Sequence, residues 1–261
     1  MKSRRDLVLE EMGLTPIWRL RHAGAAPEDA PPTESVPVPA SPVTPHQSRP
    51  ISHAVSVTDT GDRRSEIMSL DWGPLKVRVA SCTDCPLHAK RNKTVFGVGD
   101  ENADWLFVGE GPGADEDAQG EPFVGQAGKL LDNMLAAISL KRGANVYIAN
   151  LIKCRPPGNR NPEPGEALRC EPYLHRQIEL IRPKLIIALG KVAAANLLAS
   201  DASVASMRGR IHQYRGIPLI VTYHPAYLLR SLADKAKAWA DLCFAVRYMK
   251  DLQGGKAAPT S

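Results

Sequence analysis

No stretch of the sequence is apolar for long enough to span a membrane, and the first residues, MKSRRDLVLEEMG, lack the apolar core of a signal peptide. We therefore expect a cytoplasmic protein without a membrane partner. In that reducing compartment, the five cysteines are not expected to form disulfide bonds.

Two common phosphate-binding sites are also missing. Gly109-x-Gly111-x-x-Ala114 loosely matches the dinucleotide fingerprint, but Pro112 lies inside the turn. The acidic residues 115–117 would repel a pyrophosphate where a helix N-terminus should attract it. No Gly-Lys-Ser/Thr follows, so the turn is not a P-loop either. Carboxylates here suit another task, such as holding a water or stabilising a cation that develops on a sugar. A solvated surface turn is the alternative for the two aspartates.

The 261 residues divide by composition into an N-terminal segment, a linker and a folded part. Residues 1–22 carry a weak amphipathic pattern, which predicts either a loosely docked helix or a segment that binds a protein partner. Residues 23–65 are rich in proline and are expected to be a disordered linker. The folded domain is predicted at 66–252, with a flexible tail at 253–261. An apolar content of 43% suffices for a core, and a net charge of +5 permits a nucleic-acid partner without requiring one.

The folded part alternates apolar strand patterns with amphipathic helix patterns, which indicates an α/β fold. We predict a three-layer α/β/α sandwich around a central, mainly parallel four-stranded sheet. Strands are expected at 105–109, 146–149, 184–189 and 217–222, with 211–214 joined to the last of these by a hairpin turn at Arg215-Gly216. Helices are expected at 67–80, 127–140, 191–199 and 233–252, with a helical stretch up to Ile181 that is broken at Pro172.

Polar side chains stand at the ends of three predicted strands. Because ligands of parallel sheets bind beyond the carboxyl ends of the strands, Glu110, Asn150 and His224 are expected in one crevice. The Asn150 amide suits the Watson–Crick edge of a base, and His224 could donate to a developing oxyanion. Phe123, which lies among glycines, could present its ring to a planar ligand. A turn-forming asparagine, a structural histidine and a core phenylalanine are the alternatives.

Four of the five cysteines form two pairs along the chain. Cys82-Thr-Asp-Cys85 has the two-residue gap that lets two thiolates bind one metal centre. Cys154 and Cys170 lie in an arginine-rich loop and in the helix after it. The number of ligands fits structural zinc and an iron–sulfur cluster alike, and the wide step from Cys154 to Cys170 favours the cluster. Cys243 lies on the last apolar helix and is expected in the core.

Together, these motifs resemble the iron–sulfur type of uracil-DNA glycosylase, family 4, from about Cys82 to Lys250. The resemblance does not cover residues 1–65. The matching segments are CTDCPL (82–87), GEGPGADEDAQGEPFVGQAGKLLD (109–132), NLIKCRPPGNRNP (150–162), the Cys170-Glu-Pro-Tyr-Leu block, RPKLIIALG (182–190), RGR (208–210) and HPAYLLR (224–230).

The resemblance implies roles for the strand-end residues. Phe123 would stack on an extruded uracil, Asn150 would pair with its edge, and His224 would contact O2 as charge builds on the leaving base. Glu116 would position or activate the hydrolytic water. Glu110 is the second catalytic candidate, and either carboxylate could be the one that matters more to catalysis. Further residues would complete the site: Glu110, Gly111 and Gly113 in the pocket wall, Asn159 near the pocket, and Cys82, Cys85, Cys154 and Cys170 around a [4Fe–4S] cluster that braces the loop against DNA.

The resemblance also implies a surface that holds DNA. Leu228 would wedge into the gap that the extruded base leaves, and Leu229 or Arg230 would share this role. Ordinary solvated surface is the alternative for the basic residues. The candidates for phosphate contacts are Arg155, Arg160, Arg208 and Arg230.

The implied activity is that of a monofunctional uracil-DNA glycosylase, which releases uracil from single- or double-stranded DNA and leaves an abasic site for base excision repair. We expect a monomer that associates with the nucleoid when it acts. No lyase lysine is evident. A relative that traps uracil-DNA covalently has a histidine in the loop after the asparagine strand, and this sequence has none between Cys154 and Cys170, so turnover is expected. A non-catalytic, metal-braced module that binds nucleic acid is the second hypothesis.

Overall fold

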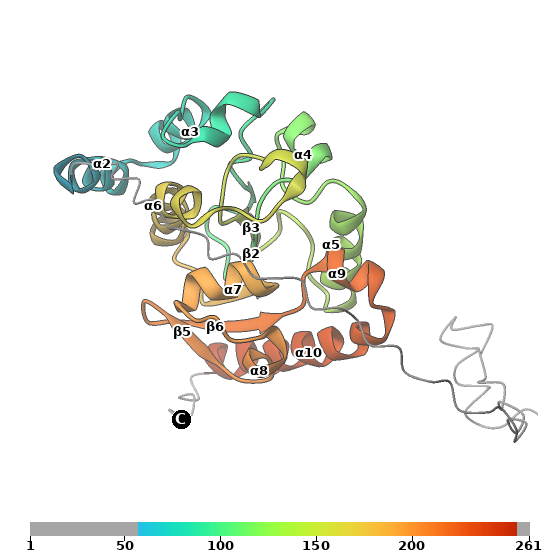
Figure 1. The fold of residues 1–261 in the computed structure, drawn as a ribbon. Helices are drawn as coiled ribbons and strands as arrows, with labels where there is room; N and C mark the ends of the chain where they lie inside the picture. The colour runs from blue at the N-terminus through green and yellow to red at the C-terminus, as the bar shows by residue number, and fades with distance from the viewer. Residues whose placement is uncertain (1–56, 255–261) are drawn as a thin grey trace, which may run out of the picture. The chain divides into compact units, whose positions relative to one another are not determined.

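The structure, a computed structural model, describes residues 57–254 (Figure 1). The predicted N-terminal segment, most of the linker and nearly all of the tail lie outside this range. Helix α2 (Val57–Ser69) crosses the predicted domain start at residue 66. Its Arg63 and Arg64 bind Asp84 and Glu171 at 2.8 and 2.7 Å, so the helix is tied to the rest of the domain. The last part of the predicted linker is therefore helical in the structure.

The sheet has six strands in the described residues, in the order β1-β3-β2-β4-β6-β5. The four middle strands are parallel, as predicted, and the short outer strands β1 and β5 pair antiparallel. The two edge strands raise the count from the predicted four to six. The strands are β1 (Val98–Gly99), β2 (Trp105–Gly109), β3 (Val146–Asn150), β4 (Leu185–Leu189), β5 (His212–Tyr214) and β6 (Ile217–Thr222).

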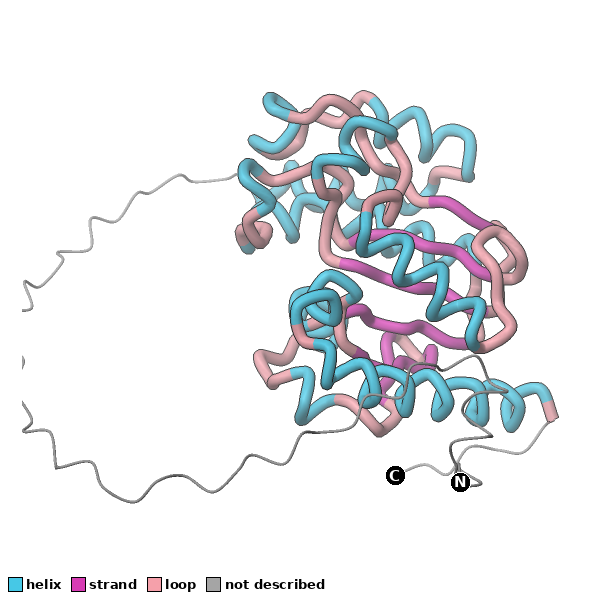
Figure 2. The backbone as a smooth tube through the Cα atoms, turned by 90° about the vertical axis from the view of Figure 1, so that its right-hand side faces the viewer, coloured by secondary structure: helices cyan, strands magenta, loops and turns pink. Residues whose placement is uncertain are grey.

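Helices cover both faces of this sheet, which makes the predicted three layers (Figure 2). Alternate residues of β2 point to opposite faces: Leu106 and Val108 pack in one core with α3, α6 and α7, and Trp105 and Phe107 pack in the other with α5 and α10. Every residue of β2, β3 and β4 is buried, as expected for central parallel strands. The remaining helices are α3 (Trp72–Ala80), α4 (Ala114–Gln119), α5 (Gln126–Ala137), α6 (Pro164–Ile181), α7 (Lys191–Leu198), α8 (Val204–Met207), α9 (Pro225–Arg230) and α10 (Lys235–Gln253), with short 3-10 turns at Pro86–Lys90, Pro157–Asn159 and Leu232–Asp234.

Local structure departs from the sequence-based expectation at two places. The single helix predicted at 67–80 is two helices, separated at residues 70–71. Helix α6 runs unbroken through Pro172, although proline removes one helical hydrogen bond. Burial of its neighbours Cys170, Tyr173 and Leu174 outweighs this loss, because packing supplies most of a helix's stability in a protein.

The hairpin turn between β5 and β6 is confirmed. Arg215 and Gly216 both have positive φ, at 51° and 80°, which is the backbone twist that joins two antiparallel strands tightly. Within the range 57–254, no helix combines the length and the apolar character needed to cross a bilayer.

Candidate active site

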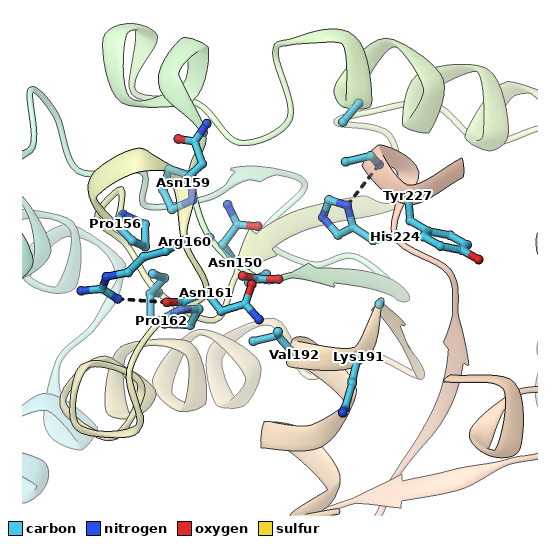
Figure 3. Close-up of a pocket in the computed structure, with 18 of the residues that line it drawn as sticks. Asn150, Pro156, Asn159, Arg160, Asn161, Pro162, Lys191, Val192, His224 and Tyr227 are labelled. Carbon is cyan, nitrogen blue, oxygen red and sulfur yellow. Dashed lines mark hydrogen bonds between the residues drawn. The ribbon is translucent and has the colours of Figure 1, made fainter. Parts of the chain in front are cut away.

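A cleft of about 780 Å³ opens at the carboxyl edge of the parallel strands. Glu110 follows β2, Asn150 ends β3, and His224 lies two residues after β6, and all three line this cleft. Figure 3 shows Asn150 and His224 in it. The strand register explains their proximity, because Gly109 is paired with Asn150 across β2 and β3. The prediction that separate strands bring these three groups to one crevice is confirmed.

Asn150 lies at the base of the cleft with an unpaired amide oxygen. The residue is 2% exposed, and its Oδ1 has no hydrogen-bond partner among residues 57–254. Such a buried acceptor costs free energy unless a ligand supplies a donor. The neighbouring strand leaves room for this arrangement only because residue 109 is glycine: a Cβ there would lie 2.5 Å from both Asn150 Oδ1 and the Phe123 ring.

Phe123 forms one wall of the site in an unusual backbone conformation. Its φ is 56°, its side chain is 6% exposed, and its ring centroid lies 5.5 Å from that of His224. A non-glycine residue in the left-handed region persists only where its surroundings hold it. Arg142 donates to the carbonyl oxygens of Pro122 and Phe123, each at 2.8 Å, and Gly128 packs directly against the Phe123 backbone.

Glu116 holds the other side of the same loop. Its Oε1 accepts from the backbone N–H groups of Val124 and Gly125 at 2.9 and 3.1 Å, and its Oε2 accepts from that of Gly113 at 3.1 Å. Both oxygens are thus engaged by the backbone, which favours a positioning role over the predicted activation of water. Glu110, in contrast, has no hydrogen bond to its carboxylate from any residue of the range 57–254, and burial raises its pKa.

The buried member of the acidic run is Asp117, which is 1% exposed. It accepts hydrogen bonds from the backbone and side-chain nitrogens of Asn92, at 2.6 to 3.1 Å. This aspartate therefore anchors the loop after the first cysteine pair, and the alternative of a solvated turn is wrong for it. Asp115 is exposed.

His224 is held as a neutral imidazole. Its Nδ1 accepts from the backbone N–H of Ala226 at 3.1 Å, so Nε2 carries the proton of the neutral ring. Burial lowers the pKa of His224 to about 4; Arg230 lowers it too, and Glu116 opposes the shift. Near neutral pH the ring is therefore an uncharged donor through Nε2–H.

Cys82, Cys85, Cys154 and Cys170 line one small, mostly apolar cavity, so the structure brings together the two predicted cysteine pairs. The guanidinium of Arg91 donates to Cys154 Sγ at 3.1 Å, and the backbone N–H of Lys153 donates to Cys170 Sγ at 3.2 Å. Burial raises the pKa of the Cys170 thiol to about 12. Among residues 57–254, no three Cys, His, Asp or Glu side chains lie in an arrangement that could hold a single metal ion. Sulfurs spread around one cavity, with N–H donors aimed at two of them, fit a thiolate-bound cluster better than one ion.

Polar groups around this cavity are paired with one another. Burial would raise the pKa of Asp84, but hydrogen bonds from Cys82 and Arg63 lower it to about 2. The hydroxyl of Tyr173 also donates to Asp84 at 3.1 Å, and Arg78 lies 3.4 Å from the same carboxylate. Asp84 is therefore the centre of a polar network at one side of this mostly apolar cavity.

Lys153 connects the cysteine cavity to the cleft. Its buried Nζ donates to the backbone carbonyl of Asn150 at 2.9 Å and to Gln177 Oε1 at 2.7 Å. Burial lowers the pKa of Lys153 to about 8, and the thiols of Cys170 and Cys154 oppose the shift. Sequence reasoning did not single out this lysine or Arg142, because their partners are backbone carbonyls that no motif records.

Two of the four arginines predicted to contact phosphate are already ion-paired. Arg160 binds Glu166 with both guanidinium nitrogens, at 2.7 and 2.8 Å. Arg208 binds the buried Asp241, which also accepts from the Thr222 hydroxyl at 2.8 Å. These pairs mainly order the loop and the end of β6, so the two arginines are weaker phosphate candidates than expected.

The other predicted DNA contacts are more accessible. Arg155 donates to the side chain of Asn159, and Arg230 has no ion pair within the described range. On helix α9, however, Leu228 is 1% exposed and Leu229 is 43% exposed. Leu228 is thus buried in this structure, and its predicted role as the wedge in DNA stays a prediction. Of the two leucines, Leu229 is the one that faces outward.

The strand-end cleft of this α/β domain holds the Asn150 amide, the Phe123 ring and the His224 imidazole. These groups together define a class of enzymes that act on nucleobases. The profile of the Uracil DNA glycosylase superfamily matches residues 96–243. Type-4 uracil-DNA glycosylases of Archaeoglobus fulgidus and Thermotoga maritima are 46% and 42% identical to the chain over 159 and 176 residues. These matches span 58% and 67% of this chain, and 79% and 89% of the relatives. A type-5 uracil-DNA glycosylase of Pyrobaculum aerophilum is 27% identical over 183 residues, which is 58% of this chain and 80% of that protein.

The chain belongs to the uracil-DNA glycosylase superfamily, in its type-4 family.

Proposed function

We propose that the protein is a monofunctional enzyme that extrudes deoxyuridine from DNA and hydrolyses its N-glycosidic bond. Uracil is released and an abasic site remains, which base excision repair then processes. The observation that carries the proposal is the unpaired, buried amide oxygen of Asn150 beside the Phe123 ring and the neutral imidazole of His224. Family membership supports the same activity.

Asn150 would select uracil by its hydrogen-bond pattern. Its Oδ1 would accept from uracil N3–H, and its Nδ2 would donate to O4. Cytosine presents the opposite pattern, an acceptor at N3 and an amino donor at C4, so it would leave both amide atoms unpaired. Sites that are built to hydrogen-bond one pattern discriminate strongly against its inverse.

Phe123 and His224 would act on the bound base. The Phe123 ring stacks on uracil and offsets part of the free energy spent on extrusion. As the C1′–N1 bond breaks, its electron pair passes to N1 and spreads to O2. The Nε2–H of His224 donates to O2 and stabilises this anion without giving up its proton. The fixed tautomer keeps this donor oriented towards the charge that develops.

Glu110 would hold the water that completes the reaction. The water oxygen bonds to C1′, its proton passes to the Glu110 carboxylate, and uracil N1 later takes up a proton from solvent. We prefer Glu110 to the predicted Glu116, because the oxygens of Glu116 are already bound by three backbone N–H groups. Glu116 then contributes by holding the loop of Phe123. Gly111 and Gly113 complete the wall, and Asn159 lies at its edge.

The four cysteines would hold a [4Fe–4S] cluster. Support comes from their convergence on one cavity and from the N–H donors directed at Cys154 and Cys170. When bound, the cluster supplies a rigid crosslink and takes no part in bond cleavage. Iron and sulfide analysis, with visible absorbance, of protein purified without oxygen tests this. Colourless protein with stoichiometric zinc would overturn it.

DNA would lie across the mouth of the cleft. Arg155 and Arg230 would contact phosphates, and Leu229 would enter the space that the extruded base leaves. In this proposal the protein acts as a monomer in the cytoplasm, at the nucleoid, on single- or double-stranded DNA. The domain limits at residues 66 and 252, and a partner for residues 1–22, stay predictions.

Incubation with a uracil-containing oligonucleotide, followed by alkali, tests the activity directly. Cleavage at the uracil position only after alkali is expected, and cleavage without alkali would indicate a lyase. Asn150→Ala and His224→Ala should retain DNA binding while release falls by about 100-fold or more. Unchanged release by both variants would sink the site assignment. Binding without any release by the wild type would favour the non-catalytic module.

A further inference from the structure

Two tyrosines at one end of the cleft form a stacked pair that the proposed chemistry does not use. The rings of Tyr223 and Tyr227 lie 5.2 Å apart at an interplanar angle of 19°. Both residues line the cleft, and Tyr227 lies beyond His224 when viewed from Asn150 (Figure 3). The pair is therefore adjacent to the reacting base without contacting Asn150, the group that reads it.

The Tyr227 ring is held rigidly. Its hydroxyl donates to Asp234 Oδ2 at 2.6 Å, and its backbone N–H donates to the carbonyl of His224 at 3.0 Å. On the far side, the Arg208 guanidinium lies 5.9 Å from the Tyr223 ring and is fixed by the buried Asp241. A ring that is fixed before binding loses little conformational entropy when a ligand stacks on it.

Tyr227 also has surface available for a ligand. The residue is 37% exposed although Tyr223 stacks on it, and it stands three residues after His224 on the first turn of α9. Leu228, the side chain expected to wedge into DNA, is 1% exposed, so Tyr227 and not Leu228 is accessible at this rim of the cleft. Aromatic platforms beside cationic side chains are how proteins hold bases of single strands, and Arg230 lines the same rim.

We propose that Tyr227 is a stacking platform for an unextruded nucleobase next to the target deoxyuridine. The proposal rests on the proposed function, because it takes the deoxyuridine to be in the cleft. Stacking tolerates any base, so Tyr227 contributes affinity and not sequence preference. Its contribution should be largest on single strands, whose bases have no complementary strand to pair with.

The experiment compares substrates that differ only in the flanking base. Single-stranded oligonucleotides carry one uracil, with either a natural base or an abasic spacer at the 5′ or the 3′ neighbour. For the wild type, a spacer on one side should raise KM about 10-fold with kcat within about two-fold. Tyr227→Ala should raise KM by a similar factor on the natural substrate, and the spacer should then have little further effect.

Tyr227→Phe keeps the ring and should stay within about three-fold of the wild type. Leu232→Ala serves as the matched control, since Leu232 is 65% exposed and lies outside the cleft. Thermal melting of each variant reports on folding. Equal KM values for wild type and Tyr227→Ala, or equal spacer penalties in both, would overturn the platform. Anisotropy measurements of binding with the same oligonucleotides repeat the comparison without hydrolysis, so a failure of catalysis and a failure of the platform are distinguishable.

Discussion

The cleft and the cysteine cavity differ in how their polar groups are satisfied. In the cleft, neither the Asn150 amide oxygen nor the carboxylate of Glu110 has a hydrogen-bond partner in the described part of the chain. Around the cysteine cavity, Asp84 is bound by Arg63 and Tyr173. Unpaired polar groups raise the free energy of the empty cleft until a substrate supplies their partners. The paired groups around Asp84, in contrast, stabilise one fixed structure. The difference distinguishes residues of the cleft that would contact the substrate from residues of the cysteine cavity that stabilise the fold. Substitutions in each region test it.

The largest expected effect is on catalysis in the cleft. Glu110→Gln should lower kcat by about 10²- to 10⁴-fold, because the amide cannot take the proton of the water. The melting temperature should change little, since the carboxylate holds no other group. Single-turnover release of uracil from a labelled oligonucleotide measures the rate, and retained DNA binding confirms that the site is intact.

Glu116→Gln provides the contrast. One of its amide positions would be an NH2 group facing backbone N–H donors, which should cost about 1–3 kcal/mol of stability. We expect a lower melting temperature and a smaller loss of kcat than for Glu110→Gln. A larger loss of kcat in the Glu116 variant, with unchanged melting, would reverse the two roles.

At the cysteine cavity the main effect should be on stability. Cys170→Ser removes a proposed cluster ligand and leaves a hydroxyl in a buried, apolar wall. We expect loss of the visible absorbance and a fall in unfolding free energy of several kcal/mol, since metal binding and folding are coupled. Cys243→Ser, at the fifth cysteine, is the control and should keep the absorbance. Full iron content in the Cys170 variant would contradict the ligand assignment.

The pH dependence should also separate the groups in the cleft. Burial raises the pKa of Glu110, so kcat should fall with unit slope as pH drops through a value above 4.5 and the carboxylate gains a proton. The residual activity of Glu110→Gln should lack this limb and fall only near the pKa of His224, about 4. An acid limb at the same pH in both enzymes would exclude Glu110 as its source.

His224 affects stability with a defined sign. Its pKa is about 4 in the folded protein and near 6.5 when unfolded, so between these values only the unfolded chain binds the proton. Stability should therefore decrease as pH falls from about 6.5 towards 4. Urea unfolding at several pH values measures this slope, and His224→Gln should reduce it. An equal slope in both proteins would show that other groups cause it.

The smallest effect is expected at the loop of Phe123. Arg142→Ala removes two hydrogen bonds to the Pro122 and Phe123 carbonyls and should raise KM by about 10-fold, because the left-handed backbone at Phe123 loses its support. Arg142→Lys can restore one of the two bonds and should recover part of the affinity. Steady-state assays of both variants check this, and equal KM values in wild type and Arg142→Ala would remove Arg142 from the site.

The sequence predicts the groups that follow from strand ends and motif spacing. Asn150 and His224 could be placed in one crevice because a predicted apolar strand ends beside each of them. Cys82 and Cys170 could be assigned to the same metal site from the spacing of the cysteines. The burial of Leu228 could not be predicted, because a short helix gives too few turns to show which side chains face inward. Helix α6 continues through Pro172 since tertiary packing outweighs local preference. Arg142 and Lys153 were missed because no motif records their hydrogen bonds to the backbone carbonyls of Phe123 and Asn150.

The short segment from Asn150 to Cys154 has a consequence for how this family can vary. Lys153 reaches back to the Asn150 carbonyl, while its own backbone N–H is bound to Cys170 Sγ. The segment therefore connects Asn150, the residue proposed to read the base, to the cysteine cavity at a fixed distance. An inserted or deleted residue here would shift both ends at once, so a change in the cysteine cavity would also move the amide that reads the base.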